Sequence, residues 1–256
     1  MEEHWLRYVL AVLAGMLAGG INTLAGSGSL VTLPMLIFLG LDATIANATN
    51  RVGVLLGSLT AATTFRRSGH LAMKGTPWLL GPAIVGSIAG AQAAAILDPK
   101  SMHLAIGVVM VLMLGVILIK PRRWLVEHAE PANHKRLSSV AIFFAIGAYG
   151  GFIQAGVGIF LLSALVLHAH YSLVQANALK VLAVLTLTAP ALIVFILHNQ
   201  VHWGFGLLMA SGQITGSWLA ARFASRHPNA GVWIRRLLIL VVVINIVKLF
   251  GLLPGF

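Results

Sequence analysis

Two basic residues, Arg51 and Lys180, lie inside long apolar stretches of the sequence. Arg51 comes eight residues after the start of the stretch 43–65, and Lys180 six residues after the start of 174–197. If both stretches are membrane helices, a rise of about 1.5 Å per residue places the charges roughly 9–12 Å from opposite membrane faces. A central position costs at least about 2.5–3.5 kcal/mol on the insertion scale, so each charge needs a partner.

No acidic residue falls inside a predicted span. The six acidic residues all lie at segment ends or in loops: Glu2, Glu3, Asp42, Asp98, Glu127 and Glu130. Asparagine accompanies both cations instead, with Asn47 and Asn50 before Arg51 and Asn177 before Lys180. We therefore predict that a bound anion neutralises both cations. The alternative is that the long side chains extend to the membrane surface, away from any site.

Glycine-rich interruptions form the second group of candidate site residues. The stretch "GGINTLAGSGSLVTLP" (19–34) and its echo "GGFIQAGVGIF" (150–160) both lie within apolar sequence. A break in a membrane helix leaves backbone polar groups unpaired, and such breaks persist where they line a cavity. The half-helix that begins near Ser29 presents N–H groups with partial positive charge, which bind anions well. Gly19, Gly20, Gly150 and Gly151 are assigned to close helix packing instead.

These arguments predict one binding site for a small anion, with no catalytic, metal or cofactor role. The charges come from Arg51 and Lys180, and the breaks supply N–H donors. The predicted substrate-binding residues are Asn22, Gly26, Ser27, Gly28, Ser29, Asn47, Asn50, Arg51, Gln154, Gly156, Gly158, Asn177 and Lys180.

The composition indicates the elements that position this site. Of the 256 residues, 59% are hydrophobic and 9% are charged, whereas a soluble domain has about 25% charged residues. The chain is therefore predicted to be an all-α integral membrane protein embedded in the lipid bilayer. The net charge of +11 comes largely from Lys and Arg in short loops. Such an excess is typical of the cytoplasmic loops of a membrane protein and does not require nucleic-acid binding. The absence of cysteine excludes disulfides and cysteine-based sites.

Ten apolar segments follow along the chain, at 5–22, 28–41, 43–65, 76–97, 102–119, 138–153, 157–170, 174–197, 203–222 and 233–250. The segments 28–41 and 157–170 are too short to span a bilayer alone. The polar stretch 120–137 is predicted to be a cytoplasmic linker. It separates a first transmembrane repeat, 1–119, from a second, 138–256, each with five segments and one broken helix or re-entrant hairpin.

The two halves show weak internal similarity in a shared order. At an offset of 130 residues, 26–28 aligns with 156–158 and 46–48 with 176–178, and Arg51 meets Lys180 after a slip of one residue. Basic residues concentrate in 66–74, 120–137 and 222–236, which are predicted to face the cytoplasm. Because 66–74 lies inside and its counterpart 198–202 outside, the repeats are predicted to be inverted, with both termini outside.

The same residues resemble the sulfite exporter TauE/SafE family of bacterial anion transporters. The resemblance rests on "GGINTLAGSGSLVTLP", "ATNRVGVLLGSLTAATTFRRSGHL", "GAYGGFIQAGVGIF" and "NALKVLAVL", and covers about 18–97 and 146–222. It implies secondary transport of sulfite, thiosulfate, sulfoacetate or another sulfonate, across a bacterial inner membrane. The family's signatures fall on Gly26–Gly28 and on Asn50 and Arg51. Lys180 matches the second basic position, where Leu179 replaces the preceding polar residue.

The sequence therefore predicts an alternating-access carrier for a small sulfur-containing anion. An anion channel on the same inverted-repeat scaffold is the main alternative. A third hypothesis, a hydrolase that uses Ser27 or Ser29 with a histidine base, requires a histidine at that depth, and none is expected there. A histidine could carry a coupling proton, and a homodimer is compatible with the pattern.

Overall fold

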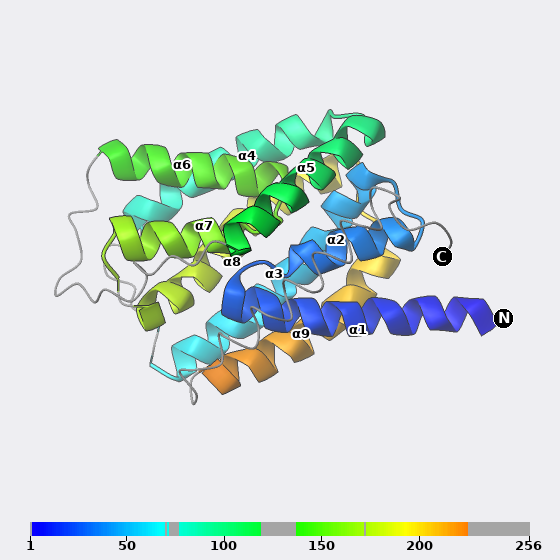
Figure 1. Cartoon of the computed structure of the whole chain (residues 1–256), viewed down its shortest axis with the longest axis horizontal. Helices are drawn as coiled ribbons and strands as arrows, with labels where there is room; N and C mark the ends of the chain where they lie inside the picture. The colour runs from blue at the N-terminus through cyan, green and yellow to red at the C-terminus, as the bar shows by residue number, and fades with distance from the viewer. Residues whose placement is uncertain (1, 70, 72–76, 119–136, 172, 225–256) are drawn as a thin grey trace.

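A computed structural model describes residues 2–69, 71, 77–118, 137–171 and 173–224 of the chain (Figure 1). Every regular element in these ranges is a helix, which confirms the predicted all-α class. The helices are α1 (Glu2–Ala25), α2 (Ser29–Phe38), α3 (Ala43–Arg67), α4 (Pro77–Ala95), α5 (Pro99–Leu118), α6 (Leu137–Phe152), α7 (Val157–Ser163), the π-helical continuation η2 (Ala164–His168), α8 (Leu173–Leu197) and α9 (Trp203–Ala224).

Each of the first nine predicted segments contains a helix, whereas the tenth, 233–250, lies outside the described residues, as does nearly all of the linker 120–137. Within the described ranges, α1, α4, α5 and α8 contain stretches that are long and apolar enough to cross a membrane. The helices α3 and α9 are equally long but more polar. The polar side chains of α3 are explained by its position, because most of them are buried against other helices rather than facing lipid.

The first helix ends at a break, and the chain then turns back on itself. Gly28, just before α2, packs against the carbonyl of Ala18 and against Asn22, both on α1. Figure 1 shows α1 and α2 as a hairpin that opens toward one end of the molecule, and α6 and α7 as a hairpin that opens toward the other end. The ten residues of α2 extend about 15 Å, half the thickness of a bilayer core.

Both breaks use the same backbone conformation and meet inside the molecule. Gly26 has φ +75° and Gly156 has φ +73°, in the left-handed region that glycine adopts without a steric cost. The N–H of Gly158 donates to the carbonyl of Gly26 across the two breaks, at 2.9 Å. The interruptions are therefore a single packed unit, although they lie far apart in the sequence.

Glycines also hold helices of the two halves together. On α1 and α9, Gly15 and Gly19 lie against the carbonyls of Met209 and Gln213, and Gly212 and Gly216 against those of Val12 and Met16. On α4 and α6 the arrangement recurs: Gly86, Gly90, Gly147 and Gly151 contact the carbonyls of Phe144, Ala148, Ala83 and Ser87. Each broken helix thus packs on a helix of the opposite half, through small residues that let backbones approach.

The helices that carry the two cations lie at the centre of the bundle. Contacts run in the order α1, α9, α3, α8, α4 and α6, with α3 and α8 packed together in the middle. Large apolar side chains are exposed on outer helices, including Leu13 of α1, Leu104 of α5 and Leu207 of α9. Such exposure suits a lipid environment, whereas Arg51 and Lys180 are buried among the helices at the centre.

Candidate functional site

Arg51 of α3 is fully buried, at 0% exposure, and its guanidinium caps the end of α6. Its Nη1 donates to the carbonyl of Gly150 at 3.0 Å, and its Nη2 to those of Gly151 at 2.5 Å and Phe152 at 3.4 Å. These are the last three residues of α6, whose carbonyls have no partner within the helix and carry partial negative charge. The guanidinium carbon also lies 4.7 Å from the ring centroid of Phe195.

Lys180 of α8 occupies the corresponding position at the other broken helix. It is also at 0% exposure, and its Nζ donates to the carbonyl of Thr23 at 2.9 Å and to Oδ1 of Asn177 at 2.6 Å. Thr23 lies two residues before the end of α1 at Ala25. Each cation thus binds the C-terminal end of a broken helix from the opposite half of the chain.

These contacts correct one step of the sequence argument, in which both cations lacked a partner in the protein. Their partners are neutral oxygens at helix ends, which sequence patterns do not reveal. A helix C-terminus carries about half of a negative charge, so Arg51 keeps a net positive field, as Lys180 does whenever its amine is protonated. In the described residues, neither Arg51 nor Lys180 has a hydrogen bond or ion pair with a carboxylate.

Asparagines of α3 connect this centre to both breaks. Asn50 donates from Nδ2 to Ser29 Oγ at 3.0 Å and accepts a hydrogen bond from Thr32 Oγ1, so it fixes the start of α2 against α3. Asn47 donates from Nδ2 to the Phe152 carbonyl at 2.8 Å, beside Arg51. The structure therefore brings Asn47, Asn50 and Arg51 together with the two breaks.

The remaining predicted residues differ in what they offer a ligand. Gln154 donates from Nε2 to Thr188 Oγ1 on α8. The N–H of Gly158 is already bonded to Gly26, which removes it from the expected set of free donors. Asn22 lies partly buried against Gly28. The helix α2 begins after Gly28 without a side-chain cap.

Unpartnered polar atoms gather among the predicted site residues. In the described part of the chain, four of the seven buried side-chain atoms without a hydrogen-bond partner belong to this set: Ser27 Oγ, Asn47 Oδ1, Arg51 Nε and Gln154 Oε1. Leaving a buried polar atom unpaired costs about 1–3 kcal/mol, and native proteins keep such atoms mainly where function or water requires them.

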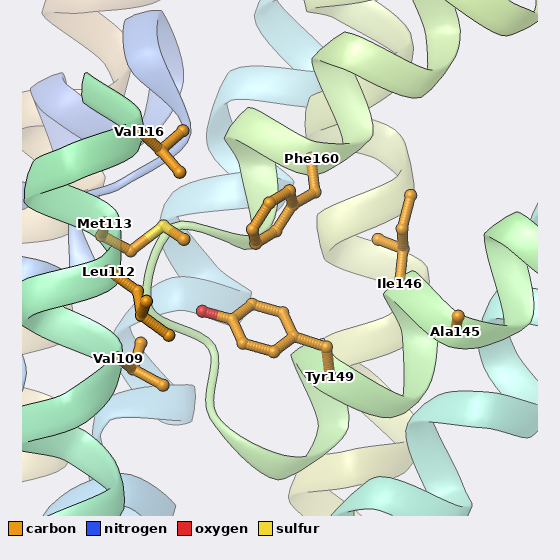
Figure 2. A pocket seen from close by; sticks show the side chains of 8 residues that line it. All are labelled: Val109, Leu112, Met113, Val116, Ala145, Ile146, Tyr149 and Phe160. Carbon is orange, nitrogen blue, oxygen red and sulfur yellow. The ribbon is translucent and has the colours of Figure 1, made fainter. Parts of the chain in front are cut away.

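An apolar pocket lies beside the second break and was not predicted. It has a volume of about 450 Å³ and is lined by residues of α5, α6 and α7. Figure 2 shows Tyr149 reaching across it toward Leu112 and Met113 of α5. The Tyr149 hydroxyl donates to the Ala155 carbonyl at 2.5 Å, and its ring packs edge-on against Phe160, with centroids 5.2 Å apart. Neither Arg51 nor Lys180 is among the residues that line this pocket.

The hydrolase hypothesis gains no support from the serine contacts. Ser29 Oγ accepts a hydrogen bond from Asn50, and Ser27 Oγ has no partner among the described residues. Among the described residues, a serine–histidine hydrogen bond joins Ser139, near the start of α6, to His168 at 3.1 Å.

Several contributors were missed by the sequence analysis. The carbonyls of Thr23, Gly150, Gly151 and Phe152 hold the cations, and Phe195 covers Arg51. Backbone oxygens leave no trace in residue types, and Phe195 lies in an ordinary apolar run. Gly150 and Gly151 were assigned to packing, which Gly151 does perform against Ser87, but their carbonyls are also ligands of Arg51.

Comparison with known proteins gives consistent matches over nearly the whole chain. A protein of Sinorhizobium sp. named "Probable membrane transporter protein ORF9" is 25% identical over 252 residues, which cover 97% of this chain and 93% of that protein. "Probable membrane transporter protein YfcA" of Escherichia coli K12 is 26% identical, with 81% and 77% covered. "Probable membrane transporter protein YdhB" of Bacillus subtilis is 24% identical, with 87% and 89% covered.

No solved structure gives a significant match. The family described as "Sulfite exporter TauE/SafE" matches residues 11–249, which include both breaks, both cations and all of the described helices from α2 onward. Because the match covers well over half of the sequence, the chain belongs to the sulfite exporter TauE/SafE family.

Proposed function

We propose that this protein is a secondary carrier that moves a small sulfur-containing anion across the bacterial inner membrane by alternating access. The candidates are sulfite, thiosulfate, sulfoacetate or another sulfonate. Membership of the sulfite exporter family and the names of the relatives, all probable membrane transporter proteins, support this class of function.

One observation carries the proposal: two fully buried cations bind helix ends in the opposite half of the chain. Arg51 binds the end of α6 and Lys180 the end of α1, and their hydrogen-bond acceptors are all neutral oxygens. Burial of a charge is costly unless it is paired. A pair of helix ends offsets part of two positive charges, and an anion of one or two negative charges supplies the remainder. An anion also offers an acceptor to the two unpartnered donors of the site, Ser27 Oγ and Arg51 Nε.

The binding mode follows from the donors. The oxygens of a sulfite or sulfonate group accept several hydrogen bonds at once, which suits the three kinds of donor proposed for the site: a guanidinium, an ammonium and a hydroxyl. The start of α2, beside Ser27, has no side-chain cap and adds the positive end of a helix dipole, although the N–H groups of Leu30 and Val31 already bond to the carbonyls of Ser27 and Gly28. Arg51 retains its unpartnered Nε–H for this purpose.

The arrangement of the broken helices supports inverted repeats and alternating access. Hairpins that open toward opposite ends of the molecule are what two oppositely oriented halves produce (Figure 1). Arg51 and Lys180 are both at 0% exposure, which is compatible with the occluded state of such a carrier. Both chain termini are proposed to lie outside.

Transport by purified full-length protein in lipid vesicles tests this function. Uptake of labelled sulfite, thiosulfate and sulfoacetate is measured for the unmodified protein, for Arg51→Ala and for Arg66→Ala. Arg66 is a matched control, because it lies on the same helix but is exposed at its end. We expect Arg51→Ala to abolish uptake while the protein remains monodisperse, and Arg66→Ala to retain it. Unimpaired uptake by Arg51→Ala contradicts the charge argument.

Electrical recording separates the carrier from the channel alternative. A carrier changes conformation for each anion and moves too few ions for resolvable single openings. Discrete single-channel currents from the reconstituted protein would favour the channel and contradict alternating access.

A further inference from the structure

The two cations differ in one chemical property that bears on the cargo. Arginine does not lose its proton under protein conditions, whereas lysine can. The structure places one of each at the two crossing points between the halves, both at 0% exposure. The centre thus combines a permanent charge with a charge that can be switched by a proton.

The hydrogen bonds of Lys180 match the neutral amine. Its Nζ has two acceptors in the described structure, the Thr23 carbonyl and Asn177 Oδ1. A neutral amine has two N–H groups, and both are satisfied there. A protonated amine has three, and the third has no acceptor until an anion enters. Arg51 differs, since three carbonyls and the Phe195 ring hold it regardless of a ligand.

We propose that Lys180 takes up a proton together with the anion, so that the carrier moves the two as a unit. The inference rests on the proposed function of an anion carrier. On loading, the amine gains one proton from the same aqueous side as the anion, and its third N–H donates to that anion. On release, anion and proton leave to the other side and Lys180 returns to the amine.

In the described part of the chain, no ionisable side chain is bonded to Lys180. Lys180 is the only ionisable residue of α8, and the packed helices α4 and α7 contain none. The ionisable residues of the other helices that pack on α8 are Arg51, Arg66 and Arg67 of α3, Tyr149 of α6, His168 of η2, and Glu2, Glu3, His4, Arg7 and Tyr8 of α1. The group on α1 lies at its start, at least 15 residues from Thr23, and His168 is bonded to Ser139. Among the described contacts, none of these residues bonds to Lys180.

The test measures anion and proton movement in the same vesicles. Unmodified protein is reconstituted with a pH-sensitive dye inside, and valinomycin with potassium clamps the membrane potential. Thiosulfate and sulfoacetate are the probes, because both remain fully ionised near neutral pH, so a moving proton belongs to the protein. We expect uptake of either anion to acidify the lumen. Anion affinity should fall about tenfold per pH unit on the alkaline side, as uptake of one proton requires.

Two variants sharpen the result. Lys180→Arg keeps the charge but cannot release it, and we expect anion binding that no longer depends on pH and no lumen acidification. Lys100→Arg is the control, since Lys100 is exposed at the start of α5, and both fluxes should persist. If only sulfite is transported, its own titration is common to both proteins, and the difference in pH dependence between unmodified protein and Lys180→Arg reports on Lys180.

The outcomes distinguish the two proposals. Anion uptake by the unmodified protein without acidification, and with affinity independent of pH, overturns the proton inference and leaves the anion carrier standing. Absence of uptake for all three anions overturns the proposed function, and the inference with it. If Lys180→Arg does not fold, the measurements on the unmodified protein decide the question alone.

Discussion

The two cation sites have the same arrangement, a buried cation at the C-terminal end of a broken helix, but differ in the cation and in its contacts. Arg51 crosses from the first half to the end of α6 and binds three consecutive carbonyls, with Phe195 against its face. Lys180 crosses from the second half to the end of α1, where it binds one carbonyl and one asparagine. Both sites replace a missing carboxylate with the negative end of a helix.

The difference indicates a division of labour. Five donors in a rigid fork suit Arg51 to hold a helix end in place, whereas the compact ammonium of Lys180 is held by fewer contacts and can change its charge. The first site is therefore the more structural, and the second is the more responsive. The breaks show the opposite contrast, because Gly26, after the helix end that Lys180 binds, is enclosed by backbone, whereas Gly156, after the helix end that Arg51 binds, meets a flexible side chain.

The largest expected effect is at the breaks. A Cβ added at Gly26 would lie 2.5 Å from Cα and C of Gly158, which are backbone atoms that cannot move alone, whereas one at Gly156 would meet the Met113 side chain, which can. Both positions have positive φ, which costs an alanine about 1–2 kcal/mol. We expect Gly26→Ala to prevent recovery of folded protein and Gly156→Ala to lower stability by about 1–2 kcal/mol, by thermal unfolding in detergent.

A third glycine isolates the backbone contribution. Gly40 has φ +97° and nothing within 4 Å of its added Cβ, so Gly40→Ala reports strain without a steric clash. An equal loss of stability in Gly26→Ala and Gly40→Ala would show that the contact between the breaks is unimportant.

The sequence was sufficient for much of this architecture. Helix positions followed from apolar length, and the breaks from glycines beside polar residues. Arg51 and Lys180 stood out because a charge in an apolar run is rare. The match of 26–28 with 156–158 also anticipated two equivalent turns, and Gly26 and Gly156 do share one conformation.

The partners of the cations could not be found in this way. Their acceptors are mostly backbone oxygens, which every residue has, and their availability depends on where a helix ends in space. The crossing of each cation to the opposite half is a tertiary feature of the same kind. The segment 43–65 was predicted from its apolar residues, but the burial of most polar side chains of α3 inside the bundle is a tertiary feature that the pattern does not show.

An intermediate effect is expected at the two equivalent asparagines. Asn177 supplies one of the two acceptors of Lys180, so Asn177→Ala leaves a buried N–H unpaired at a cost of about 1–3 kcal/mol. Asn47→Ala should cost less than about 1 kcal/mol, because the Phe152 carbonyl keeps Arg51 and the unpartnered Asn47 Oδ1 disappears. Thermal unfolding of both variants checks this order, and a larger loss for Asn47→Ala would reverse the assignment of the more responsive site.

The smallest effect is expected at the aromatic ring that covers Arg51. Lys180 has no such ring among the described contacts. Phe195→Leu removes a ring 4.7 Å from the guanidinium carbon, a contact worth about 0.5–2 kcal/mol. Phe143→Leu is the matched control, because Phe143 is as buried and is not recorded in contact with a cation. A double-mutant cycle of Phe195→Leu with Arg51→Met isolates the ring–cation energy from the lost volume. We expect a coupling of about 1 kcal/mol; a value near zero would mean that the three carbonyls alone fix Arg51, and that the two cation sites differ only in their count of oxygens.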